Sequence, residues 1–149
     1  MARAPAVQET EALPEADRLD GFPHPRETRT LLGHETAERV LAEAFAGGRM
    51  HHAWLLAGPK GLGKATLAYR FARLALGAKR LGPRPLDCDP EAAISRRVAQ
   101  LAHPDLFVLR RGINERGKPR REITVDDARE LPALALEGLA QRGLRPGGT

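Results

Sequence analysis

Apolar residues recur at helical spacing in two stretches of the chain. The first lies between Gly33 and Gly48, where charged side chains occupy the opposite face, and the second runs from Lys64 to Leu76. Both patterns predict amphipathic helices that end at glycine, and a weaker repeat predicts a modest third helix near residues 92–101. The apolar positions are Val40, Leu41, Ala44 and Phe45 in the first stretch and Leu67, Phe71, Leu74 and Ala75 in the second.

Continuous apolar runs predict buried strands. Residues 53–57 read Ala-Trp-Leu-Leu-Ala between polar residues and a glycine, and residues 105–109 form a second run. Such short runs are typical of strands buried on both faces of a parallel sheet. Because the first run leads through a glycine-rich turn into a predicted helix, we expect an α/β fold of the P-loop NTPase class, with a parallel sheet and flanking helices.

Proline, glycine and charge divide the chain into three parts. Residues 1–30 are rich in proline and charge and predict a flexible N-terminal arm. Residues 31–136 hold the predicted helices and strands of a partial P-loop domain, and residues 137–149 predict a disordered tail. Within the domain, the arginine-rich residues 110–121 are interrupted by turn residues, which predicts a long hairpin-like connection.

The amino-acid composition limits the kinds of partner, covalent link and cellular compartment to be expected, but it does not identify a ligand. Lys and Arg number 24 against 19 Asp and Glu, a net charge of +5, which suits phosphate-rich partners. The single cysteine, Cys88, excludes an intramolecular disulfide and a cysteine-based zinc cluster within this sequence. We find neither a secretory h-region nor a run of about 20 apolar residues. We therefore expect a cytoplasmic protein that makes no membrane contact.

A phosphate-binding pattern occupies residues 58–64, which match G-x-x-x-x-G-K between a predicted strand and a predicted helix. Its glycines let backbone N–H groups surround a polyphosphate, and the helix N-terminus adds partial positive charge. Lys64 would reach the β- and γ-phosphates. The alternative is a glycine-rich turn without a ligand. The expected nucleotide-binding residues are Gly58, Pro59, Lys60, Gly61, Leu62, Gly63, Lys64, Ala65 and Thr66.

The residue after the lysine departs from the full motif. A Ser or Thr hydroxyl there ligates Mg²⁺, but this chain has Ala65, and Thr66 is rotated from that position by roughly 100° on a helix. Acidic residues that follow residues 123–125 are the candidates for a Walker B carboxylate, yet Asp126 better fits the N-cap of a short helix. We therefore expect no catalytic residue, no metal site and no intrinsic ATPase activity, with any ATP binding weak or independent of Mg²⁺.

Other polar features are open to two interpretations. The basic residues 110–121 could contact nucleic-acid phosphates or form a solvated loop, and no aromatic residue lies among them for base stacking. His51 and His52 favour packing or capping over metal binding, because no nearby carboxylate or cysteine completes a site. Cys88 lies in a charged loop and favours an unspecialised free thiol.

Several segments together resemble one family. They are Leu32-Gly33-His34-Glu35, Gly48-Arg49-Met50-His51-His52-Ala53-Trp54-Leu55-Leu56, residues 58–66, His103-Pro104-Asp105-Leu106 and residues 121–127. The combination resembles the N-terminal part of the delta prime subunits of the bacterial DNA polymerase III clamp loader, over about residues 22–131. It is far more specific than a P-loop alone.

The resemblance implies an AAA+ fold and a part in loading the sliding clamp onto primed DNA during replication. Delta prime subunits act mainly as a stator, which implies the gamma/tau and delta subunits as partners, with the sliding clamp and primed DNA contacted indirectly. The cysteine cluster of zinc-containing members is missing, so no zinc is expected. Because the family's Walker B strand, Ser-Arg-Cys segment, lid and helical collar are also missing, we expect a truncated or frame-shifted product after about Pro132.

Three hypotheses follow. The leading one is a delta prime-like component of the polymerase III holoenzyme that does not hydrolyse ATP. The second is a stand-alone P-loop ATPase or phosphotransferase in which Asp126 or Asp127 serves the metal, and the third is an Arg-rich nucleic-acid-binding module. Dependence of nucleotide affinity on Mg²⁺ separates the first two, and a steep salt dependence marks the third.

Overall fold

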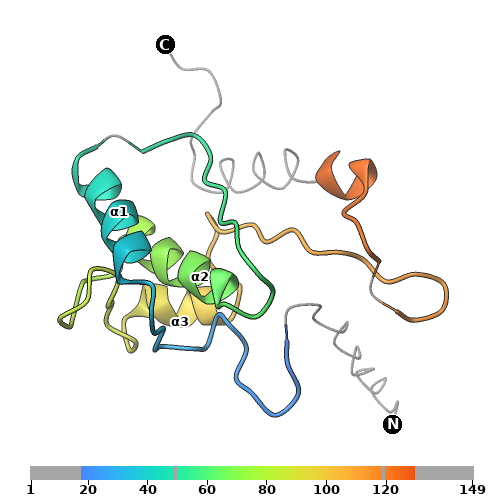
Figure 1. Cartoon of the computed structure of the whole chain (residues 1–149), viewed down its shortest axis with the longest axis horizontal. Coiled ribbons are helices and arrows are strands. Elements are labelled where there is room, and N and C mark those ends of the chain that lie inside the picture. The colour runs from blue at the N-terminus through green and yellow to red at the C-terminus, as the bar shows by residue number, and fades with distance from the viewer. Residues whose placement is uncertain (1–17, 49, 119, 130–149) are drawn as a thin grey trace, which may run out of the picture.

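The computed structural model describes residues 18–48, 50–118 and 120–129. Helices α1 (Glu35–Ala46), α2 (Lys64–Ala75) and α3 (Ala93–Ala99) are joined by long irregular segments. α2 contacts both α1 and α3 and therefore lies at the centre of the helical layer (Figure 1). The first two helices form where the sequence predicted them, and the third is shorter than predicted. In the described part of the chain, no helix is both long and apolar enough to cross a membrane.

Glycine ends α2 with the two hydrogen bonds of a Schellman motif. Gly77 has a φ of 92°, a left-handed conformation that glycine adopts without steric cost. Its N–H donates to the Leu74 carbonyl at 3.0 Å, and the N–H of Ala78 donates to the Arg73 carbonyl at 2.9 Å. These bonds satisfy the last carbonyls of the helix and turn the chain sharply into the segment of residues 79–91.

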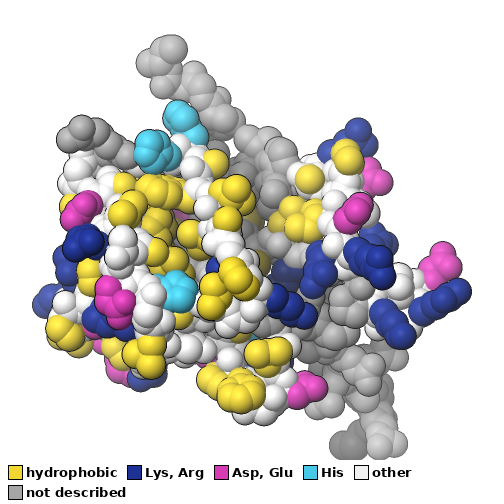
Figure 2. Space-filling model, in the orientation of Figure 1, with side chains coloured by type: hydrophobic (Ala, Val, Ile, Leu, Met, Phe, Trp, Pro, Cys, Tyr) yellow, Lys and Arg dark blue, Asp and Glu magenta, His cyan; other side chains and the backbone are white. Residues whose placement is uncertain are grey.

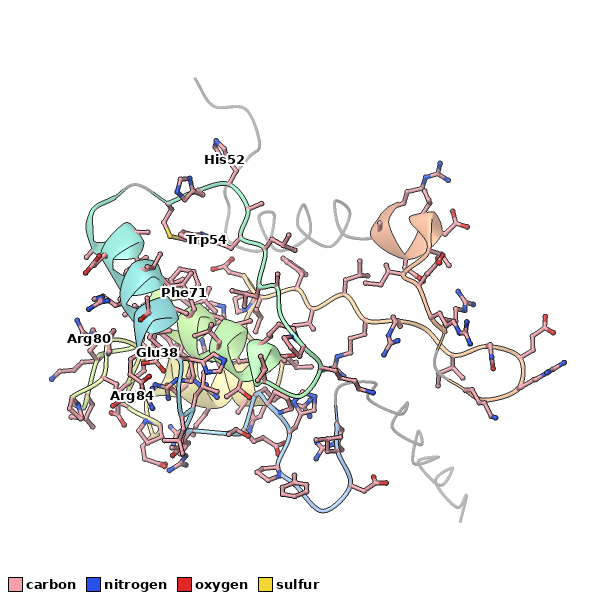
Figure 3. All side chains as sticks on the ribbon, in the orientation of Figure 1. Glu38, His52, Trp54, Phe71, Arg80 and Arg84 are labelled. Carbon is pink, nitrogen blue, oxygen red and sulfur yellow. The ribbon has the colours of Figure 1, made fainter. Side chains whose placement is uncertain are left out.

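The hydrophobic core lies between α1, α2 and the segments that flank them. Buried leucines from four parts of the chain meet there, and half-buried aromatic side chains pack against them. Trp54 and Phe71 are in edge-to-face contact with ring centroids 6.4 Å apart (Figure 3). Fully burying one leucine contributes about 1.5–3 kcal/mol, so this small cluster contributes several kcal/mol to stability. The buried leucines are Leu31, Leu41, Leu67, Leu74 and Leu86.

The two apolar runs that predicted strands take no strand structure within the described residues. In residues 53–57 only alternate side chains face the core: Trp54 and Leu56 are half-buried, whereas Leu55 is 92% exposed. Figure 2 shows apolar side chains gathered at the surface over α1, α2 and residues 50–57. A strand needs hydrogen-bonding partners on neighbouring chain segments, and the described residues supply none to these runs. The parallel sheet stays a prediction.

A carboxylate from α1 is buried at the centre of an ion-pair network. Glu38 is 0% exposed. Its Oε1 lies 3.1 Å from an Arg70 nitrogen. Its Oε2 lies 3.4 Å from Nε of Arg84, and Figure 3 labels both Glu38 and Arg84. Arg70 also pairs with Asp87 at 2.8 Å. Removing charges from water costs several kcal/mol per ion, so the network is stable because both guanidinium groups share the buried carboxylate.

Arginine side chains also donate hydrogen bonds to the backbone of the segment that precedes α1. Arg70 donates to the carbonyl of Arg29, and Arg84 donates to the carbonyl of Leu31. Arg73 donates to the carbonyl of Arg26. The described residues of the predicted N-terminal arm are thus bonded to α2 and to the segment after it. Residues 1–17 and 130–149 lie outside the described residues, so the predicted domain boundaries stay predictions.

Replacing Glu38 tests this network. We expect Glu38→Ala to lower the free energy of unfolding by about 3–5 kcal/mol, because the buried Arg70 and the half-buried Arg84 lose their shared counter-charge. Urea unfolding followed by circular dichroism measures the change. Glu43→Ala, an exposed carboxylate on the same helix, is the matched control and should change the value by less than about 0.5 kcal/mol. Equal effects of the two substitutions would show that the Glu38 ion pairs do not stabilise the fold.

Candidate phosphate-binding loop

Residues 58–63 form a loop that ends at the first residue of α2. Gly58, Gly61 and Gly63 have φ values of 144°, 88° and 83°, which L side chains rarely adopt. Gly63 is the N-cap of α2, and a Cβ built on it would lie 2.6 Å from the Leu31 side chain. Glycine is therefore required at Gly63 for two reasons: the backbone conformation and the close approach of Leu31.

The amide groups of this loop are available to a ligand. Within the described residues, the N–H groups of residues 60–66 donate no hydrogen bond to the protein. The next residue, Leu67, donates to the carbonyl of Gly63 at 2.9 Å and begins the regular hydrogen bonding of the helix. Consecutive unpaired N–H groups at a helix N-terminus favour an anion such as a phosphate. The residues present therefore fit a phosphate group.

Lys64 lies over its own loop. Its Nζ donates to the carbonyl of Gly58 at 2.8 Å and to the carbonyl of Pro59 at 2.5 Å. The ammonium group is thereby held on the loop side of α2, next to the unpaired amides. Thr66 is 7% exposed and Ala65 is half-buried. Neither side chain supplies a hydroxyl at the position that the full motif uses for Mg²⁺.

The acidic residues after residue 122 serve a helix end, and this corrects one prediction. Thr124, rather than Asp126, is the N-cap of a helical segment that begins at residue 125. Thr124 N and Oγ1 donate to Oδ2 of Asp127 at 2.8 and 2.7 Å, and the Asp127 N–H donates to Thr124 Oγ1 at 3.2 Å. This reciprocal pair is a capping box. The two bonds from Thr124 lower the pKa of Asp127 below its ordinary value.

Asp126 and Asp127 are therefore both engaged locally. Asp126 is exposed and pairs with Arg129 at 3.2 Å. Within the described ranges, no group of three or more His, Cys, Asp or Glu side chains is arranged to hold a metal ion. The ring of His51 packs edge-on against Trp54 with centroids 5.1 Å apart, which confirms a packing role for that histidine.

The basic segment forms the predicted hairpin. The N–H of Arg120 donates to the Gly112 carbonyl at 2.7 Å, and the N–H of Asn114 donates to the Lys118 carbonyl at 2.8 Å. The Asn114 side chain accepts the N–H groups of Arg116 and Lys118, each at 3.0 Å, and so orders the tip. Lys and Arg side chains gather over this hairpin in Figure 2. The exposed cations are Arg111, Arg116, Lys118, Arg120 and Arg121.

Comparison with known proteins identifies the family to which this chain belongs. A family model described as "DNA polymerase III, delta subunit" matches residues 33–138, which is more than half of the chain. The chain therefore belongs to that family of DNA polymerase III subunits. Its matched segment, which includes the loop and α2, is a domain of the clamp-loader type.

Individual relatives are similar over a shorter stretch. A "DNA polymerase III subunit gamma" from Buchnera aphidicola subsp. Schizaphis graminum (strain Sg) is 35% identical over 49 residues, or 33% of this chain and 14% of that protein. The protein with the same description from Buchnera aphidicola subsp. Acyrthosiphon pisum (strain APS) is 37% identical over 49 residues, with the same two shares. The chain thus matches about one seventh of the length of these relatives. No solved structure matches the chain.

Alanine substitutions at two loop glycines distinguish backbone strain from a steric clash with Leu31. We expect Gly63→Ala to lower the free energy of unfolding by about 1–2 kcal/mol for the left-handed backbone and by about 1–3 kcal/mol more for the collision with Leu31. Gly61→Ala is the matched control, because its φ is 88° and an added Cβ meets no atom within 4 Å. Urea unfolding measures both. If the two variants are equally stable, Leu31 does not constrain the loop.

Proposed function

We propose that this chain is a delta prime-like component of the bacterial DNA polymerase III clamp loader, which binds nucleotide phosphate weakly and does not hydrolyse it. Its partners would be the gamma/tau and delta subunits in the cytoplasm, with the sliding clamp and primed DNA contacted indirectly. The domain would take the α/β P-loop fold of AAA+ proteins, with residues 53–57 and 105–109 as strands of a parallel sheet. One observation carries this proposal: a glycine-built loop with unpaired amides opens α2 inside the segment that matches the family.

The chemistry of the loop supports binding without hydrolysis. The backbone amides of residues 60–66 would bind phosphate oxygens, and Lys64 would neutralise their charge once it leaves the carbonyls of Gly58 and Pro59. When Mg²⁺ is bound in an NTPase, it neutralises charge that develops during phosphoryl transfer. This chain has Ala65 where a hydroxyl ligand belongs, and Asp126 and Asp127 are engaged at a helix end. The loop would therefore keep affinity and lack turnover.

Nucleotide titration tests the proposed loop. We expect an ATP analogue to bind with little dependence on Mg²⁺, and Lys64→Ala to weaken that binding roughly tenfold or more, because charged hydrogen bonds contribute about 1.5–3 kcal/mol. Lys79→Ala is the matched control, since Lys79 is an exposed lysine outside the loop. Isothermal titration with and without Mg²⁺ gives the affinities. If Lys64→Ala leaves the affinity unchanged, the binding proposal is wrong. Steady release of phosphate from ATP would favour an ATPase instead.

Assembly is tested separately from nucleotide binding. The full chain should co-elute with purified gamma/tau and delta subunits of a clamp loader in size-exclusion chromatography. Association that survives Lys64→Ala would support a stator role that does not depend on nucleotide. If neither subunit retains the chain, the delta prime role is wrong even where the loop binds phosphate.

The hairpin supports a second candidate function, direct contact with nucleic acid. Its ordered tip presents exposed cations with few carboxylates beside them, an arrangement suited to phosphate backbones. We expect binding to single-stranded DNA to weaken with salt, with a slope of about 0.7 per neutralised phosphate. A triple change of Arg111, Arg116 and Arg120 to Ala should reduce that slope by about 2. A double change of Arg39 and Arg97, exposed cations outside the hairpin, should leave it unaltered; equal slopes for both variants would exclude the hairpin.

A further inference from the structure

A cleft separate from the loop opens between α2, α3 and the segment of residues 79–91. Its volume is about 440 Å³, and no residue of 58–66 lines it. This size falls within the range of about 300–1,000 Å³ typical of small-molecule sites. Side chains from α2, α3 and two irregular segments converge on it, so its shape depends on the packing of the whole helical layer.

Arg73 lines this cleft as a buried cation. It is 8% exposed and donates to the carbonyl of Arg26. In the part of the chain that the structure describes, no carboxylate lies within ion-pairing distance of Arg73. Burial lowers the pKa of Arg73, Cys88 opposes this effect, and the charges of Arg70 and Arg29 lower the pKa further. Buried charges in proteins are nearly always paired, and the described residues do not supply the negative partner of this guanidinium group.

Ser95 gives a second, independent sign of a missing partner. It lies in α3, is 2% exposed and lines the same cleft. Its Oγ has no hydrogen-bond partner among the described residues. The large majority of buried polar side-chain atoms have a partner. Arg73 and Ser95 therefore line one cleft, and the buried hydroxyl group of Ser95 has no partner among the described residues.

The carboxylates on the cleft are already neutralised. Arg96 also lines the cleft, is exposed and makes no ion pair with a described residue. The cleft consequently retains positive charge from Arg73 and Arg96. The existing pairs are Glu27 with Arg18 at 3.6 Å and with Arg26 at 3.8 Å, Asp87 with Arg70 at 2.8 Å, and Glu91 with Arg29 at 3.3 Å.

We propose that this cleft binds a small phosphate-type oxyanion, with the Arg73 guanidinium and the Ser95 hydroxyl as donors and Arg96 at its opening. A guanidinium group presents parallel N–H donors that match two oxygens of a phosphate. The bound anion would give Arg73 the counter-charge that the described residues do not provide and would accept the hydrogen bond of Ser95. The ligand is either inorganic phosphate or the phosphate group of a monoester, because both offer the same oxygens.

Cys88 provides a local reporter for this site. Its half-buried thiol lines the cleft and belongs to the single cysteine of the chain. Alkylation by neutral iodoacetamide is followed by mass spectrometry while sodium phosphate or adenosine monophosphate is titrated at constant ionic strength. We expect either ligand to slow alkylation in a saturable manner in the wild-type chain and in Lys64→Ala. That second variant separates this cleft from the loop.

Variants of the donors decide the proposal. Arg73→Gln should abolish the protection of Cys88, and Ser95→Ala should raise the half-saturating concentration about tenfold. Arg97→Gln, an exposed arginine of α3 outside the cleft, should titrate as the wild type does. Circular dichroism checks folding, and if Arg73→Gln does not fold, Ser95→Ala decides alone because it removes one oxygen atom. Protection that is absent or unsaturable with both ligands, or unchanged in Ser95→Ala, would overturn the proposal.

Discussion

The fold depends on one buried carboxylate. Glu38 accepts a hydrogen bond from Arg70 and forms an ion pair with Arg84. These two guanidinium groups also donate to the backbone carbonyls of Arg29 and Leu31. One charge on α1 thereby fixes α2, the segment before α1 and the segment after α2 relative to one another. Few leucines are fully buried, so this polar network specifies an arrangement that the apolar core alone would leave loosely defined.

The shape of the candidate phosphate-binding loop depends on this network. Arg84 holds the carbonyl of Leu31, and the Leu31 side chain packs where a Cβ of residue 63 would lie. Gly63 can adopt its left-handed conformation and start α2 with its amides unpaired. Arg70 and Arg73, in the C-terminal half of α2, line the second cleft. The two proposed anion sites are thus built on opposite ends of one helix, residues Lys64 and Arg73.

Local patterns in the sequence predicted the helices, the hairpin and the loop, because each depends on residues close together in the chain. The network was missed. Its signal was present, since Arg70 follows Leu67 by three residues and so falls on the buried face of α2, but its partners are distant in sequence. The N-cap was misassigned because Asp126 was considered alone, whereas Thr124 and Asp127 form a pair. Strand structure at residues 53–57 requires neighbouring strands, which no local pattern provides.

The position of Lys64 sets a cost for any anion that enters the loop. Its ammonium group already has two carbonyl ligands within the same loop, and these are present at a fixed, high effective concentration. A polyphosphate would bind fully only to the fraction of molecules in which Lys64 has left these carbonyls, and its apparent dissociation constant would rise in inverse proportion to that fraction. The response of the loop to a nucleotide would therefore depend on the equilibrium by which the Lys64 side chain leaves these carbonyls, as well as on the strength of the contacts.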